Sequence, residues 1–138
     1  TATTEIYTLS LHDALPDLAE VAGEAPASYV ARCVHSLRTS GIPERRYPGF
    51  WDNDGRCCGT AGVGSAVLPH DPTFARELGD TLVERAYRDG DRAWWRFVEH
   101  RNDEPLLPPG VGWMQGAAGI AGFLFELARG SSAASPAR

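Results

Sequence analysis

Two adjacent cysteines, Cys57 and Cys58, stand directly before the small-residue run Gly59–Gly64. Thiolates are good zinc ligands, and a catalytic zinc site uses three protein ligands and leaves the fourth position open. A helix N-terminus carries partial positive charge that favours a thiolate, and Gly59 permits a sharp turn after the pair. From residue types and spacing alone, the pair is a two-ligand half-site for a metal, two ordinary thiols, or a strained disulfide between neighbours.

The small-residue pattern that follows the cysteines returns once more in the chain. Aligned on Gly59 and Gly116, the two copies are 57 residues apart, and the second has Met114-Gln115 where the first has Cys57-Cys58. A fixed-period repeat is typical of an architecture that uses one supersecondary unit several times. The repeat therefore predicts the fold, and the thiols are an addition to one copy. In the other copy, Met114 is a candidate core residue.

These motifs resemble a known family. The stretch 50–53 together with Cys57–Gly64 is similar to the zinc motif of lanthionine synthetase C-like proteins. Residues 99–101 and 112–120 are similar to the last repeat of that family, and the resemblance covers roughly Leu18 to Ala128. Many members have Cys-His-Gly where this chain has Cys-Cys-Gly, and a Cys-Cys-Gly variant with an all-cysteine zinc site also occurs in the family.

The resemblance implies an all-α fold, in which this chain supplies the C-terminal repeats of an α/α toroid. It also implies that Cys57 and Cys58 bind Zn²⁺ as the cofactor. In the family a third ligand comes from a Trp-Cys-x-Gly motif in the preceding repeat, and this sequence contains no such motif. Cys33, the remaining thiol, lies on the apolar face of a predicted helix, so we predict that it is a core residue.

The implied activity is that of a cyclase in lanthipeptide biosynthesis. Zinc activates a cysteine thiol for Michael-type addition to dehydroalanine or dehydrobutyrine, and a thioether ring forms in the peptide. The implied partners are a dehydrated precursor peptide or a small thiol, together with a dehydratase or kinase-like domain in a longer protein, since family members are several times longer. The alternatives are a non-catalytic zinc-containing module that binds peptides, and another zinc-dependent toroid enzyme that activates thiols.

Other polar residues are weaker candidates for a site. His100 is a candidate acid, base or peptide-contacting residue, and the alternative is a histidine that hydrogen-bonds a loop carbonyl. His35 and His70 are predicted to face solvent. Asp52 and Asp54 are predicted to form turns rather than to act in catalysis. The tryptophans either line a peptide groove or pack between helices and loops; they are Trp51, Trp94, Trp95 and Trp113.

Composition sets broader limits on function. The chain has 138 residues, a net charge of −5 and 43% hydrophobic residues. Its charge gives no reason to expect binding to nucleic acid, and it has no apolar run of the roughly 18 residues that a membrane span needs. Three cysteines, two of them adjacent, fit a reducing compartment and metal or thiol chemistry better than a disulfide framework. We therefore expect a cytoplasmic protein.

The chain divides into three parts. Residues 1–16 contain a stretch that resembles a translated sequencing adapter, so they are predicted to be a non-native or disordered leader; the alternative is a short amphipathic turn. Residues 17–130 form the predicted toroid part, and 131–138 are a predicted disordered tail. The predicted helices, from their apolar spacing and stop signals, are Ser28–Thr39, Thr60–Leu68, Pro72–Arg88 and Gln115–Arg129.

Overall fold

The computed structural model describes residues 27–44, 53–57, 59–98 and 106–133, with side chains described up to 130. The predicted leader and residues 134–138 of the predicted tail lie outside this part of the chain. The helices of the described residues are α2 (Ala27–Thr39), α3 (Thr60–Val67), α4 (Pro72–Arg85) and α5 (Ala117–Ala133). The strands are β1 (Tyr87–Asp89), β2 (Arg92–Trp94), β3 (Phe97–Val98) and β4 (Leu106–Leu107).

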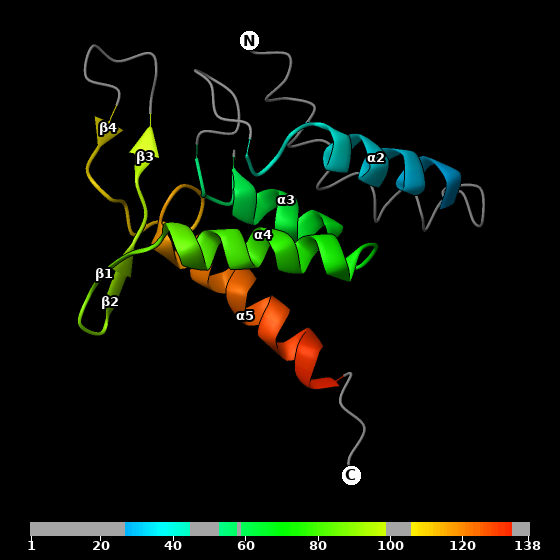
Figure 1. Ribbon diagram of the computed structural model, residues 1–138. Helices are drawn as coiled ribbons and strands as arrows, with labels where there is room; N and C mark the ends of the chain where they lie inside the picture. The colour runs from blue at the N-terminus through cyan, green and yellow to red at the C-terminus, as the bar shows by residue number, and fades with distance from the viewer. Residues whose placement is uncertain (1–26, 45–52, 58, 99–105, 134–138) are drawn as a thin grey trace.

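The described residues are mostly helical, as predicted, but they are not all-α. β1 pairs with β2, and β3 pairs with β4, both in antiparallel register. In Figure 1 the helices α3, α4 and α5 pack against one another, and the strands lie near the C-terminal end of α4. α5 continues to Ala133, beyond its predicted end. No helix in the described part of the chain is long and apolar enough to cross a membrane.

The prediction that α4 continues to Arg88 is wrong, because the chain turns into a hairpin. Ala86 is already extended, and Gly90 has a φ of 55°, in the left-handed region that favours glycine. Asp89 pairs with Arg92 across a two-residue turn of Gly90 and Asp91, and a glycine at the first turn position is one of the arrangements that such hairpins favour. The rings of Tyr87 and Trp94, which lie opposite each other on the two strands, are stacked with centroids 6.1 Å apart.

The core lies between α3, α4 and α5. α4 buries residues spaced four apart, Phe74, Leu78 and Leu82, as its sequence predicts. α5 contributes Ile120 and Phe123, which are almost completely buried. Burial of a large apolar side chain contributes about 1.5–3 kcal/mol. These contacts fix the helices whose N-terminal ends carry the candidate site.

α3 approaches α5 closely at Gly64. A Cβ atom on Gly64 would lie within 2.7 Å of both Cε atoms of the buried Phe123 ring. The ring therefore occupies the space that a side chain at position 64 would need. The small residues of α3 were predicted to permit close approach by another helix, and Gly64 confirms this.

We expect Gly64→Val to lower the free energy of unfolding by about 1–3 kcal/mol, because the branched side chain overpacks the core at Phe123. The matched control is Gly130→Val in α5, since a Cβ at Gly130 would meet no atom within 4 Å. Thermal melts of both variants measure the difference. A Gly64→Val midpoint equal to that of the control would contradict the close contact.

α2 is attached to the rest of the structure near its C-terminal end. None of its residues is buried, and Cys33 is half-buried, so the prediction that Cys33 is a core residue is wrong. The physical reason is that α2 reaches the core mainly through Leu37, which packs against the buried cluster. The next residue, Arg38, then joins α2 to the start of α4 by pairing with Asp71.

Asp71 links α2 to the first turn of α4. Its carboxylate accepts two hydrogen bonds from Arg38, at 2.6 and 3.1 Å, and one from the N–H of Phe74 at 3.0 Å. It is therefore both the N-cap of α4 and an ion-pair partner. The hydrogen bonds from Arg38 and from the Phe74 backbone lower the pKa of Asp71. The Arg38 guanidinium also lies over the Phe74 ring, 4.7 Å from its centroid.

Since the pKa of Asp71 is lower in the folded protein, its stabilising effect is complete above the unfolded pKa and disappears as pH falls through the folded pKa. We expect Asp71→Asn, which keeps an N-cap side chain but removes the charge, to lower the unfolding midpoint at pH 7. The difference from the unmodified chain should shrink below about pH 4 and vanish at lower pH. A difference that persists at pH 2 would show that the ion pair is not its cause. Thermal melts at several pH values are the measurement.

Candidate functional site

Cys57 lies in the bend 55–57 that leads toward α3, and its side chain is half-buried. Cys58, the second predicted metal ligand, and His100, the candidate acid or base, lie outside the described residues, as does Asp52. His35 and His70 are exposed, as predicted. Among the described residues, no group of three or more Cys, His, Asp or Glu side chains gathers in a way that could hold a metal ion.

The loop Asn53–Gly59 folds back over the start of α3. The first three N–H groups of the helix, those of Thr60–Gly62, donate to the carbonyl oxygens of Asn53–Gly55, each seven residues earlier, at 3.2–3.3 Å. The first N–H groups of a helix have no partner within the helix and must find one elsewhere. Here the loop provides it, so these three groups are already bonded and are not open donors for a thiolate.

The loop Gly110–Gly116 folds over the start of α5 in the same way. The N–H of Ala117 donates to the carbonyl of Gly110 at 3.0 Å. This donor and this acceptor each lie 57 residues after Thr60 and Asn53, which form the matching bond at α3. The sequence repeat is therefore a repeat of three-dimensional structure.

Glycine is required at the same place in both loops. A Cβ atom on Gly59 would overlap the carbonyl oxygen of Asn53, and one on Gly116 would lie 2.5 Å from the carbonyl oxygen of Gly110. These obstacles are main-chain atoms, which cannot turn aside as a flexible side chain can. The two glycines that align the repeat are thus the residues that let each loop close.

The two loops contact each other at equivalent positions. The N–H of Cys57 donates to the carbonyl of Met114 at 2.7 Å, and the Arg56 guanidinium lies over the Trp113 ring, 4.7 Å from its centroid. Each of these pairs joins residues that are 57 apart in sequence. The main chain of Cys57 in the first copy thus contacts the main chain of Met114, the equivalent residue of the second copy.

Several residues that sequence reasoning did not single out hold the first loop in place. Arg56 donates to Glu126 of α5 at 3.1 Å, and Ser65 of α3 donates to the other oxygen of that carboxylate at 3.0 Å. The Asn53 side chain exchanges two hydrogen bonds with the backbone of Val98 in β3, at 2.9 and 2.7 Å. These contacts join residues far apart in the chain, so no local sequence signal marks them.

Asp54 is a buried anchor of the same loop. Its carboxylate accepts a hydrogen bond from Arg85 at 2.9 Å, and the two side chains are only 11% and 17% exposed. Arg85 also donates to the carbonyl of Pro43, which joins the segment after α2 to the end of α4. Asp54 was predicted to form a turn rather than to act in catalysis, and its ion pair is structural.

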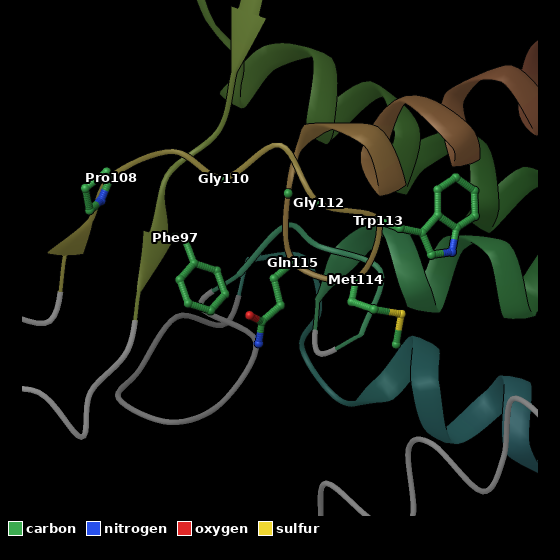
Figure 2. Close-up of a pocket in the computed structure, with 8 residues that line it drawn as sticks. Phe97, Pro108, Gly110, Gly112, Trp113, Met114 and Gln115 are labelled. Atoms are coloured by element: carbon green, nitrogen blue, oxygen red, sulfur yellow. The ribbon is translucent and has the colours of Figure 1, made fainter.

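A cleft of about 400 Å³ opens beside the second loop (Figure 2). Its described lining consists of four apolar side chains, one carboxamide and three glycines: Phe97, Pro108, Trp113, Met114, Gln115, Gly110, Gly112 and Gly116. In Figure 2 the side chains of Phe97 and Gln115 lie close to each other, and the indole of Trp113 points away from them, toward α5. Because Met114 binds the backbone of Cys57, the thiol-bearing loop lies at the edge of this cleft.

Met114 and Trp113, which are neighbours on the second loop, both lie at the surface. Met114 was a candidate core residue, but it is 48% exposed because the loop places it at the surface. Trp113 is 52% exposed and its indole lies against Gly122 of α5, whereas Trp95 is buried and donates its indole N–H to the carbonyl of Leu82 at 2.8 Å. Of the described tryptophans, Trp95 packs in the core, as one of the two predicted alternatives had it.

We expect the Asp54–Arg85 pair to be strongly coupled, since removal of one partner leaves a buried charge unpaired. Asp54→Ala and Arg85→Ala should each lower the free energy of unfolding by about 2–4 kcal/mol, and the double variant by less than the sum. Arg88→Ala on the exposed strand β1 is the control, with an expected change within about 0.5 kcal/mol. Urea unfolding measures all four proteins. Additive losses would mean that the two side chains stabilise the fold independently.

A scan against protein-family models, a search of curated proteins and a search of solved structures found no match to this chain.

Proposed function

We propose that this chain forms part of a zinc-dependent, lanthionine synthetase-like cyclase. The observation that supports the proposal best is the pair of equivalent loops, Asn53–Gly59 and Gly110–Gly116. They share the hydrogen bond that closes each loop and the glycine that it requires, and in the sequence the first loop has two adjacent cysteines where the second has Met114-Gln115. Such a repeat keeps the scaffold constant and varies the chemistry of one copy.

The proposed fold is an α/α toroid, with α3 and α5 as inner helices and α4 as an outer one. Two features support this arrangement. α3 and α5 contact each other directly, as neighbouring inner helices do, and each begins with the same loop. α4 connects the two copies and packs against both helices. The N-terminal ends of the inner helices, with their loops, then form one face of the ring.

The residues proposed to hold the zinc are Cys57 and Cys58, with a third donor outside the described residues. Two neighbouring thiols are chemically suited to zinc, which prefers sulfur and nitrogen ligands. A bound zinc would act as a Lewis acid that lowers the pKa of a substrate thiol. Two observations support zinc binding by these residues. Thiols are suitable donors, and the backbone of Cys57 is fixed by its hydrogen bond to Met114.

The reaction that we propose adds a peptide thiol across the double bond of a dehydroalanine or dehydrobutyrine residue. The sulfur bonds to the β-carbon, the electron pair of the double bond moves onto the adjacent carbonyl as an enolate, and a proton then adds to the α-carbon. The cleft beside Cys57 would hold the peptide near the reacting sulfur and keep water from part of it. His100 remains the candidate proton donor, and it lies outside the described residues.

A non-catalytic peptide-binding module is the second candidate. The observation that favours it is the described lining of the cleft, which contains no titratable side chain to donate or accept a proton. Its test is a peptide that carries both a cysteine and a dehydrobutyrine residue. An enzyme consumes the peptide thiol in a zinc-dependent manner, whereas a binding module leaves it intact. Because the cysteines would have to remain reduced, we propose a cytoplasmic location for either candidate.

We expect this chain to bind Zn²⁺ weakly, because two of three ligands are proposed to come from the cysteine pair and affinity falls when a ligand is missing. Cys57→Ser and Cys58→Ser should each abolish the binding. Cys33→Ser, which alters the thiol on α2, is the matched control and should leave it unchanged. Equilibrium dialysis followed by metal analysis gives the stoichiometry. Equal zinc content in all three variants would rule out the cysteine pair as the site.

A further inference from the structure

We infer that the cleft beside the second loop binds an uncharged, apolar segment of an extended peptide, and that the Gln115 carboxamide hydrogen-bonds the backbone of that segment. The inference names a preference within the substrate class of the proposed cyclase and rests on that proposed function. It concerns which peptide residues are preferred next to the residue that reacts. The cysteine pair by itself predicts no such preference.

The described wall of the cleft is neutral. Phe97, Pro108 and Met114 offer apolar surface, the Trp113 indole points away toward α5, and none of the lining side chains that the structure describes is ionised at neutral pH. Arg56, whose guanidinium lies over the Trp113 ring, already pairs with Glu126. A charged side chain placed in this cleft would lose hydration without gaining a counter-charge from the described lining, which costs free energy. An apolar side chain would gain by its burial.

Gln115 supplies the polar recognition. It is exposed and lines the cleft, and in Figure 2 its carboxamide lies near the Phe97 ring. A carboxamide has both a donor and an acceptor, so it can pair with the N–H and C=O of one peptide unit at the same time. A neutral peptide backbone satisfies both, whereas an isolated anion or cation satisfies one.

The second loop also leaves room for a main chain. A Cβ atom at Gly112 would meet no atom within 4 Å, so the backbone surface at Gly112 is open to a ligand. Pockets that hold ligands of modest size have volumes of about 300–1,000 Å³, and the cleft of about 400 Å³ falls at the lower end of this range. It is suited to one large apolar side chain together with its adjoining peptide units.

The position of the cleft links this preference to the thiol chemistry. Met114, whose side chain lines the cleft, accepts the hydrogen bond from the N–H of Cys57. Consecutive residues of an extended peptide advance by about 3.3–3.6 Å. A peptide residue in the cleft is therefore only a few positions from the one that reacts near the cysteines.

The test uses the whole chain and three capped pentapeptides, acetyl-Gly-Gly-X-Gly-Gly-amide, with X as leucine, glutamate or lysine. Isothermal titration calorimetry is performed in EDTA, so that the result does not depend on bound metal. We expect the leucine peptide to bind roughly tenfold more tightly than either charged peptide. Equal affinity for the three peptides, or binding of none of them, would overturn the inference.

Variants at Gln115 separate the carboxamide from the apolar wall. Gln115→Ala should weaken binding of the leucine peptide roughly threefold to tenfold, the loss expected for one or two neutral hydrogen bonds. Gln115→Glu should shift the preference toward the lysine peptide, because it adds an anion at the same place. The control is Phe125→Ala, which removes an apolar side chain that is 71% exposed on α5 and absent from the described lining. Unchanged binding in both Gln115 variants would overturn the role of the carboxamide.

The outcomes also separate this inference from the proposed function. Leucine-selective binding in EDTA together with no zinc binding would refute the cyclase and keep the cleft preference. Zinc binding that depends on Cys57 and Cys58, with no peptide preference, would refute the preference and keep the zinc site. Circular dichroism melts of the Gln115 variants, whose side chain is exposed, check that each remains folded.

Discussion

The hydrogen bonds from the first turn of each repeat helix to the loop before it are the interactions on which the rest of the structure depends. They span seven residues and use main-chain atoms on both sides. They satisfy helix N–H groups that would otherwise lack partners, and they draw the loop tightly over the helix. Gly59 and Gly116 are required for this closure, because any side chain there would collide with a carbonyl oxygen. Through it, Cys57 is fixed with respect to α3.

The contact between α3 and α5 then determines the position of one loop relative to the other. Phe123 rests against Gly64, so the two helices lie close together, and their loops meet at Cys57 and Met114. Glu126 strengthens this relation, since it accepts from Arg56 of the loop and from Ser65 of α3. The geometry of the candidate site is therefore a product of core packing as much as of the cysteine motif.

The sequence predicted those features whose physical cause is local or periodic. The spacing of apolar residues in Pro72–Arg85 identified α4, and the repeated glycines identified two equivalent helix starts. Prediction from the sequence failed where the local structure is determined by residues that are distant in the chain. The end of α4 is set by a hairpin whose rings Tyr87 and Trp94 stack, and residues 86–88 alone are compatible with a helix. The pair Arg56–Glu126 joins residues 70 apart, and no local pattern signals it. The prediction for Met114 failed because an apolar residue on a loop can line a cleft as well as a core.

The way in which the loops close has a consequence for how such a site can change in evolution. Each loop is held by its main chain, by glycines and by anchors on either side of the variable pair, such as Asn53 and Asp54 in the first copy. The two residues before the closing glycine differ between the copies, cysteines in one and Met114-Gln115 in the other, while the glycine and the main-chain hydrogen bond across seven residues are the same in both. New side chains can therefore be sampled there at little cost to folding. One duplicated unit can acquire reactive groups while its neighbour acquires surface for recognition, and the two functions remain adjacent in space from the start.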